Sequence, residues 1–408
     1  MSKLSYLDKL LDGVVVEWKP LEEVAKYIRG LTYSKSNEST DGQGYRVLRA
    51  NNVTLSSNCL NLNDVKVVRF DTKVKDSQKL YKNDILISAA SGSREHVGKV
   101  AYIKSDIDYY FGGFMGVVRC NEKLNPRYLF HVLTSDIFQK YLDEMLNSST
   151  INNLNSAVMG GFKIPIPCPN KSDKSLTIQS EIVRALDKFT ALTSELTAEL
   201  TAELTMRKKQ YNYYRDQLLR FKESEVEWKT LGEVIQMRAG QHISTSKIME
   251  RREDGYVYPC FGGNGIRGYV KQKSHDGEHL LIGRQGALCG NVKRMKGQFY
   301  ATEHAVVVSA LSGINIDWAF HMLTAMNLNQ YSSKSAQPGL AVGKLQKLTL
   351  PVPSIKRQEY IASILDKFDM LTDSSTEGLP REIELRQKQY EYYRDLLFSF
   401  PKPEATSN

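Results

Sequence analysis

The sequence of 408 residues has few cysteines, no adjacent prolines and no long apolar run. Its five cysteines are widely spaced and form no C-x-x-C pair, which argues against a disulfide framework and a structural zinc site. No stretch approaches the roughly 18 uninterrupted apolar residues that a membrane helix needs. The first residues, MSKLSYLDKLLDG, lack the apolar core of a signal peptide. We therefore expect a cytoplasmic protein that holds no metal ion.

Motifs that carry catalysis are also missing. The hallmark of adenine methyltransferases needs two adjacent prolines, and the chain has none. The segment Gly92–Val100 departs from a phosphate-binding loop in its glycine spacing and lacks the Ser or Thr that binds magnesium. His275 and His279 stand four apart but not in H-E-x-x-H, and the Glu-Trp-Lys trios at 17–19 and 227–229 lack a preceding paired Asp. We predict no catalytic residues, so the chain is not an enzyme by itself.

The charge balance points to a polyanionic partner. The chain has 55 Lys and Arg against 46 Asp and Glu, a net charge of +9. Both signs are mixed along the sequence, so the excess belongs to folded surfaces and not to a basic tail. Nucleic acid is the first candidate for such a partner.

Internal repeats organise the chain. The segment Val16–Gly30 returns at Val226–Gly240, 210 residues later. LDKF at 186–189 and the tyrosine-rich run that ends in YYRD at 216 return 179 residues later. The unequal offsets mean that a variable region and a long repeated segment alternate twice. The predicted segments are 1–175, the N-terminal helix end with the first variable region; 176–225, a central helix; 226–355, the second variable region; 356–400, a C-terminal helix; and 401–408, a tail.

The two variable regions carry strand and helix patterns. Strand-like runs lie at 65–70, 84–90, 116–120 and 305–310, separated by Gly, Asn, Asp and Ser clusters. Helical patterns cover 127–146 and 317–326. Each region ends in a run with alternating prolines, KIPIPCP or LTLPVPS, where we expect an extended path and a domain boundary.

The repeated segments are predicted to be long helices. Apolar residues recur every three or four positions from Ile178 to Leu218, over a length of about 65 Å. Such a rod needs a coiled-coil-like partner, and the antiparallel second copy is the candidate. Gly378 and Pro380 in TEGLP, 376–380, should kink or break that copy. In the first copy, TSELTAELTAEL at 193–204 repeats a four-residue unit, each worth about 6 Å of helix.

The N-terminus completes the pattern. Tyr6-Leu7-Asp8-Lys9-Leu10-Leu11 resembles the end of the first long helix at 214–219, and VEW follows both. We therefore expect the N-terminus to pack beside the C-terminal helix end. The predicted fold class is α+β, with two mixed α/β domains alternating with two long helices that pair as an antiparallel coiled coil, in a pseudo-twofold cyclic arrangement.

Polar and basic side chains gather in glycine-rich loops of both variable regions. Arg can read guanine and Asn can read adenine through paired hydrogen bonds in the major groove, and both also bind phosphates. Alternatively, these loops are ordinary hairpin turns whose charged side chains are only solvated. The DNA-contact candidates are Arg46, Arg49, Asn51, Asn52, Arg94 and Lys99 in the first region, and Asn264, Arg267, Arg284, Gln285 and Lys293 in the second.

Apolar and aromatic residues of the long segments are interpreted as helix packing or partner contacts. The tyrosine clusters could instead stack on bases, but their helical spacing favours packing. The packing candidates are Leu186, Phe189, Leu196, Leu200, Leu204, Tyr211, Tyr214, Leu365, Phe368, Tyr390 and Tyr393.

The paired LDKF and YYRD helices, the VEWK openings, the proline-punctuated exits and the TAEL units resemble the specificity subunit of type I restriction-modification systems. The resemblance spans Tyr6 to about Phe400. It implies a non-catalytic subunit in which each target-recognition domain reads one half of a bipartite, asymmetric DNA site, while the helices set the unread gap.

The resemblance also implies partners. Two methylation subunits, which use S-adenosylmethionine, would dock around the helices, and two restriction subunits, which use ATP and Mg, would join them. The partners would thus be double-stranded DNA and these subunits, with no cofactor in this chain. Two rival functions are a stand-alone DNA methyltransferase or endonuclease, and a structural or RNA-binding adaptor.

Overall fold

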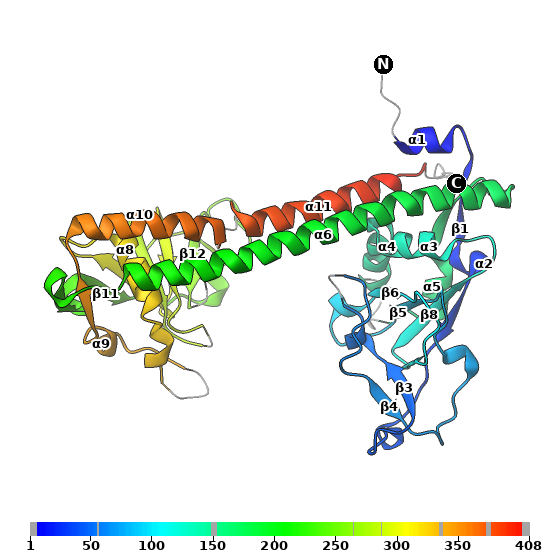
Figure 1. Ribbon diagram of the computed structural model, residues 1–408, viewed down its shortest axis with the longest axis horizontal. Helices are drawn as coiled ribbons and strands as arrows, with labels where there is room; N and C mark the ends of the chain where they lie inside the picture. Colours follow the sequence, from blue (N-terminus) through cyan, green and yellow to red (C-terminus); the bar gives the residue numbers. More distant parts are fainter. Residues whose placement is uncertain are drawn as a thin grey trace. The chain divides into compact units, whose positions relative to one another are not determined.

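The computed structural model describes residues 6–54, 57–147, 153–263, 265–286, 288–333, 338–372 and 377–401 (Figure 1). The chain divides into two compact units: unit 1 comprises residues 1–197 and 385–408, and unit 2 comprises residues 198–384. Each unit thus contains one variable region and parts of both helical segments. The boundaries drawn from the sequence instead separate the variable regions from the helical segments. No helix in the described ranges is long and apolar enough to cross a membrane.

Unit 1 begins with a short helix and continues through a β-rich region into three helices. Its elements are α1 (Tyr6–Leu11), β1 (Val16–Pro20), α2 (Leu21–Val24), β2 (Ala25–Arg29), β3 (Tyr45–Leu48), β4 (Lys66–Val68), β5 (Ile85–Ser88), β6 (Val100–Tyr102), β7 (Tyr110–Phe111), β8 (Met115–Cys120), α3 (Pro126–Leu133), α4 (Asp136–Asn147), α5 (Ser156–Gly161) and β9 (Lys163–Pro167). The helical pattern predicted at 127–146 is therefore two helices, because the chain turns at Ser135, whose hydroxyl bonds the Val132 carbonyl.

Unit 2 repeats this plan after the long helix α6 (Ser172–Leu218). Its elements are β10 (Glu227–Thr230), α7 (Leu231–Val234), β11 (Ile235–Ala239), β12 (Tyr258–Gly262), β13 (Gly265–Val270), β14 (Glu278–Gly283), β15 (Val292–Lys296), β16 (Tyr300–Ala301), β17 (Ala305–Ala310), α8 (Ile316–Ala325), α9 (Val342–Leu345), β18 (Thr349–Val352) and α10 (Ile355–Thr372). The helix α11 (Leu379–Leu397) follows and returns the chain to unit 1.

The two units share one sheet topology. In the described part of unit 1 the strand orders are β2-β8-β5-β6, β4-β3-β7 and β1-β9, and in unit 2 they are β11-β17-β14-β15, β13-β12-β16 and β10-β18. In unit 1, the sheet of β3 and β4 lies at the end of the unit away from α6 (Figure 1). The ends of β3 and β4 therefore lie far from α6 within this unit (Figure 1).

The entry and exit of each variable region pair as a two-stranded antiparallel ribbon. Trp18 of β1 faces Pro165 of β9, and Trp228 of β10 faces Pro351 of β18. The proline runs are extended, as expected, and each forms one strand of its ribbon. Proline is tolerated here because an edge strand can leave one side of its backbone without ladder bonds.

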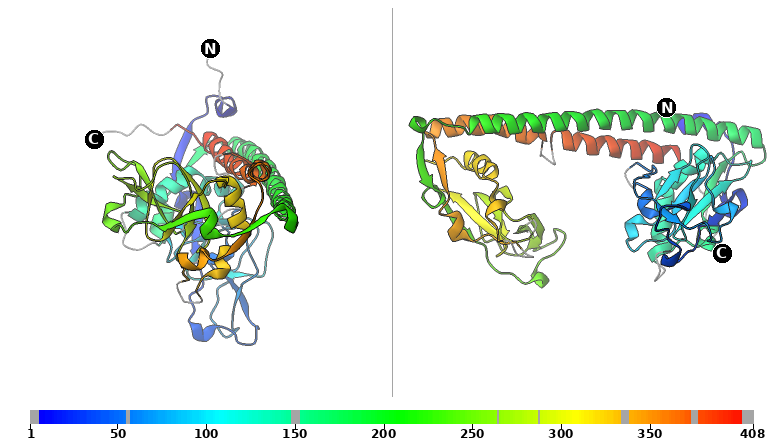
Figure 2. Two further views of the ribbon diagram at one scale, coloured as in Figure 1. Left: turned by 90° about the vertical axis from the view of Figure 1, so that its left-hand side faces the viewer. Right: turned by 60° about the horizontal axis from the view of Figure 1, so that its bottom comes forward.

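The long helices pair within each unit. α6 contains no Gly or Pro, and its TAEL units consist mostly of strong helix formers. In unit 1 the rings of Phe189 on α6 and Tyr393 on α11 stack with centroids 5.7 Å apart, and Figure 2 shows these helices side by side. In unit 2, Tyr214 on α6 stacks on Phe368 of α10 at 5.5 Å.

The second helical copy is broken where the sequence predicts it. α10 ends at Thr372 and α11 begins at Leu379, with Pro380 in its first turn, where proline is tolerated. Gly378 has a φ of +82°, and a Cβ there would lie 2.4 Å from the carbonyl oxygen of Met370. Only glycine fits this turn without strain. Thr376, the first residue of TEGLP, lies outside the described residues.

The N-terminus closes against the C-terminal end of α11 inside unit 1. Leu7 and Leu11 of α1 share one buried cluster with Leu397 and Phe398. The indole nitrogen of Trp18 donates a hydrogen bond of 2.9 Å to the carbonyl oxygen of Pro401. The cyclic arrangement predicted from the repeated YLDKLL pattern is confirmed.

Candidate nucleic-acid interface

The candidate residues at 46–52 lie on and after β3 in unit 1. Arg46 is exposed, with its guanidinium 5.7 Å from the ring centre of Tyr109. The side chains of Arg49 and Asn51 both donate to one carboxylate oxygen of Asp64, at 3.0 and 2.9 Å. Asp64 itself is largely exposed, so this cluster stays accessible to solvent. Arg46, Arg49 and Asn51 therefore remain available for contact with a partner.

Two candidates in unit 1 are buried and support the loops from within. Asn52 is only 1% exposed, and its amide nitrogen donates to the carbonyl oxygens of Asn61 and Asp64, each at 2.8 Å. Lys99 is 8% exposed, and its ammonium group donates to the carbonyl oxygens of Ala50 and Val53. Because both side chains are buried and donate inside the fold, the structure does not place Asn52 and Lys99 for contact with DNA.

Arg94 lies in a short 3-10 turn, 94–96, between β5 and β6. Its guanidinium forms an exposed ion pair of 2.8 Å with Asp143 on α4. Exposed pairs of this kind are weak, so a phosphate could compete for the arginine. The segment Gly92–Val100 is thus a turn that leads into a strand, as the mismatch to a phosphate-binding loop predicted.

In unit 2, two glycine-rich loops meet. A Cβ on Gly283 would lie 2.3 Å from the carbonyl oxygen of Gly263, so these two glycines approach at backbone distance. They line a small hollow together with Asn291 and Lys293. The second variable region thus brings the two glycine-rich loops together, although the sequence gives no sign that they meet.

Of the candidates of unit 2 that the structure describes, Lys293 lines this hollow. Arg267 is exposed on β13, and its Cδ lies 2.6 Å from where a Cβ of Gly262 would be, so the arginine covers that glycine. Arg284 is half-buried, Gln285 is exposed, and Lys293 is exposed on β15. Asn264 lies outside the described residues.

No metal site is present among the residues that the structure describes. The two ring nitrogens of His279 lie 3.0 Å from the Ser309 hydroxyl and 3.1 Å from the Asp276 carbonyl. Both nitrogens therefore already have hydrogen-bond partners within the protein. In each Glu-Trp-Lys trio, the lysine pairs with the glutamate two residues before it, at 3.4 Å for Lys19 and 2.8 Å for Lys229. These trios belong to the ribbons of β1 and β10.

Each variable region is fastened to its helix by a buried glutamine. The side-chain oxygen of Gln179 on α6 accepts a 2.8 Å hydrogen bond from the backbone nitrogen of Asn125, which caps α3. Gln358 on α10 makes the same 2.8 Å contact with Asn315, which caps α8. Sequence reasoning missed this pair, although the helical offset of 179 relates the two glutamines.

Each unit also joins a buried histidine to the aspartate of LDKF. In unit 1, His131 Nε2 lies 2.8 Å from Asp187, which also takes hydrogen bonds from Arg127. Burial would raise the pKa of Asp187, but the hydrogen bonds from His131 and Arg127 outweigh this and lower the pKa to about 2. Burial lowers the pKa of His131, and Asp187 offsets this only in part. His131 is therefore neutral at pH 7 and donates from Nε2 to an ionised carboxylate.

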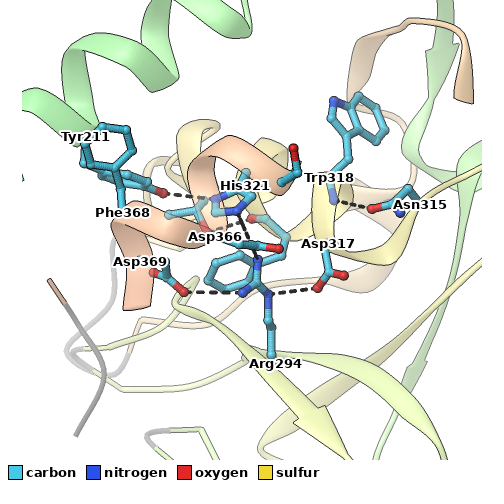
Figure 3. A network of polar contacts seen from close by, with 12 residues as sticks. Tyr211, Arg294, Asn315, Asp317, Trp318, His321, Asp366, Phe368 and Asp369 are labelled. Atoms are coloured by element: carbon cyan, nitrogen blue, oxygen red, sulfur yellow. Dashed lines mark hydrogen bonds and ion pairs between the residues drawn. The ribbon is translucent and has the colours of Figure 1, made fainter. Parts of the chain in front are cut away.

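In unit 2 the same pair lies in a larger network (Figure 3). His321 Nε2 is 2.8 Å from Asp366, and Tyr211 of α6 contacts His321 Nδ1 at 3.1 Å. Burial acts to raise the pKa of Asp366, but the bond from His321 and the charge of Arg294 hold it below its usual value. The histidine thus links α8 to both α10 and α6 within this unit.

The packing candidates divide into buried and exposed positions. Leu186 and Leu365 are fully buried and join the core of unit 1 and of unit 2, respectively. Phe189 and Phe368 stack on tyrosines of the paired helices. The leucines of the TAEL units, Leu196, Leu200 and Leu204, are half-buried, as is Tyr390; Tyr211 is buried, and Tyr214 and Tyr393 remain partly exposed.

Comparison with known proteins decides the family. The model of the type I restriction-modification DNA specificity domain matches twice, over residues 15–206 and 223–385. The chain belongs to this family. The two matches correspond to the two copies of the repeat.

Members of the family resemble the chain over nearly its full length. It is 57% identical to the specificity subunit of the type I restriction enzyme EcoprrI of Escherichia coli, covering 92% of this chain and 93% of that one. It is 38% identical to the EcoR124I/EcoR124II specificity subunit of Escherichia coli, with full coverage of both. A chain from a solved structure described as the structural basis of complex assembly and conformational transition of the type I R-M system shares the fold, with a TM-score of 0.61, 16% identity and coverage of 98% and 99%.

Proposed function

We propose that the chain is the DNA-reading subunit of a type I restriction-modification complex, in which each unit reads one half of a bipartite, asymmetric site. The observation that carries this is the repetition of one sheet topology with different loops. The strand orders of the two units correspond one to one, while the exposed basic residues, such as Arg46 and Arg267, lie at different points on them. Two unlike readers on one framework select an asymmetric pair of half-sites.

We propose that the helical segments set the unread gap between the half-sites. α6 runs from unit 1 into unit 2, and the four-residue units of 193–204 lie in the middle of it. One unit adds about 6 Å and rotates the helix face by about 40°. A change of one unit therefore alters the separation of the readers more than their facing.

The catalytic steps would belong to partner subunits. Two methylation subunits using S-adenosylmethionine would dock on the helices, and two restriction subunits using ATP and Mg would join them. Large apolar side chains exposed on the helices support a docking role, because isolated chains rarely leave so many uncovered. They are Leu192, Met206, Tyr213, Tyr214, Met370, Leu371, Tyr392, Tyr393 and Leu396.

Deleting one four-residue unit tests this function. Removal of Thr201–Leu204 shortens α6 by about 6 Å, one to two base-pair steps of 3.4 Å, so the preferred gap should shrink by one or two base pairs. The measurement is sequencing of the sites that the assembled complex methylates. Insertion of a further TAEL unit is the matched control and should lengthen the gap by a similar amount. An unchanged gap in both variants would show that the helices do not set it.

A further inference from the structure

A guanidinium holds the LDKF aspartate of unit 1 against the domain helix α3. Arg127 donates to Asp187 at 2.9 Å and lies with its Cζ 4.6 Å from the ring centre of Phe130. It also lies 5.0 Å from the ring of Tyr102 on β6. The arginine therefore connects α6, α3 and the sheet of this unit.

Unit 2 has a guanidinium in the corresponding place, but another element supplies it. Arg294 comes from β15 and bonds Asp366 of α10 (Figure 3). Its Cζ lies 4.1 Å from the ring centre of Phe320. Phe320 precedes His321 just as Phe130 precedes His131 in unit 1. The aromatic ring, the histidine and the aspartate are thus the same in both units, and only the origin of the arginine differs.

The helix position that holds arginine in unit 1 holds the opposite charge in unit 2. Arg127 stands four residues before His131, and Asp317 stands four residues before His321. Asp317 therefore cannot pair with the LDKF aspartate as Arg127 does. It pairs instead with Nε of Arg294 at 3.2 Å. Arg294 also contacts Asp369 at 3.4 Å.

The strand register shows which residue Arg294 replaces. Arg294 faces Leu280 across the β14–β15 pair, and Leu280 faces Val308 of β17. In unit 1 the equivalent path runs from Val118 of β8 through Ile85 of β5 to Tyr102 of β6. Tyr102 and Arg294 therefore occupy the same sheet position.

We propose that Arg294 is a positioning residue that takes over in unit 2 the role of Arg127 in unit 1, and that Asp317 is the change that accompanies it. The guanidinium holds the LDKF aspartate, the domain helix and the sheet together, so that each reader keeps one orientation on its own helix. The arginine can come from the helix, as Arg127 does, or from the strand, as Arg294 does, provided that only one of the two positions holds an arginine.

A swap within unit 2 tests this exchange in the full-length chain. Arg294→Tyr leaves Asp317, Asp366 and Asp369 without their shared cation, and amide exchange in α8 should become about tenfold faster. Asp317→Arg places two guanidinium groups together and should also speed exchange. The double variant recreates the arrangement of unit 1, and its exchange should return to within about twofold of the wild-type rate. A double variant no slower than Arg294→Tyr would overturn the proposal.

Two further variants test whether the effect is specific to Arg294 and Asp317. Lys296→Tyr removes an exposed cation from the same strand, which pairs with Glu278 and only senses the charge of Asp317, so it should speed the exchange of α8 far less than Arg294→Tyr does. The reciprocal swap Tyr102→Arg with Arg127→Asp should likewise spare α3, whereas Arg127→Asp alone should not.

A second readout separates positioning from mere stability, and it rests on the proposed function. In the assembled complex, Arg294→Tyr should broaden the accepted gap by about one base pair in either direction while both half-site sequences stay the same. The double variant should restore the narrow gap. Methylation reduced uniformly with an unchanged gap would overturn the positioning role but leave bipartite reading intact. If the wild-type complex did not methylate bipartite sites, the proposed function would be wrong. The amide exchange of α8 in the single and double variants would still test the exchange of Arg127 for Arg294.

Discussion

The two units attach their helices partly by contacts that are the same and partly by one that is different. Gln179 and Gln358 bind the backbone of the cap residues Asn125 and Asn315 at identical distances of 2.8 Å. The guanidinium, in contrast, comes from α3 in unit 1 and from β15 in unit 2. A contact to backbone depends only on the fold, whereas a contact between side chains can be rebuilt from another position. The readers could therefore diverge while remaining attached to related helices.

The strongest test of the shared contact is to remove both glutamines separately. Gln179→Leu and Gln358→Leu each leave a buried backbone N–H without its acceptor, which should cost about 2 kcal/mol in the unit that carries the change. The two losses of unfolding free energy should be nearly equal, because the two hydrogen bonds join the same groups at the same distance. Denaturant-dependent hydrogen exchange of α3 and α8 measures them.

The control for the glutamine variants lies on α11. Gln387 is exposed and bonds only Glu391 among the described residues, so Gln387→Leu should change the free energy of unfolding by less than about 0.5 kcal/mol. Losses in the two units that differ by more than about 1 kcal/mol would show that the two contacts are not equivalent.

A smaller effect should appear with pH in unit 1. The pKa of His131 in the folded chain lies below its usual 6.5, mainly because the ring is buried. The unfolded state therefore binds the proton more readily, and unit 1 should lose stability as the pH falls below about 6.5, by at most about 1.4 kcal/mol per pH unit. Exchange of α3 amides at pH 7.5 and 5.5 measures this loss.

A variant assigns the pH effect to this histidine. His131→Gln keeps a donor for Asp187 but does not titrate in this range, so the variant should lose less stability between pH 7.5 and 5.5 than the wild type. Because Arg127 and Arg394 also lie close enough to influence the ring, their charges must be unchanged in the comparison. An equal loss in both proteins would assign the effect to other groups.

Features repeated in the sequence could be predicted well. The helical period located α6, and the run at 305–310 coincides with β17. Gly378 and Pro380 marked the break between α10 and α11, because their backbone restrictions act locally. Local chemistry and internal repetition together were enough for these elements.

Contacts between distant segments could not be predicted in the same way. Arg294 carries no local sign that it meets Asp366, since the pairing depends on strand register. Asn52 and Lys99 look like loop residues at a surface, and only the packed fold shows that their donors are used inside. The proline runs predicted an extended path, but not their pairing, because their partner strands β1 and β10 lie more than a hundred residues away in the sequence.

The most direct test of the central claim is to exchange one reader and map the methylated sites of the assembled complex. Residues 21–162, between the paired strands β1 and β9, would be replaced by the corresponding region of a family member with another target, leaving both ribbon strands and α6 unchanged. One half-site should change while the other half-site and the gap remain those of the wild type. A change in both half-sites, or in neither, would contradict bipartite reading by the two units.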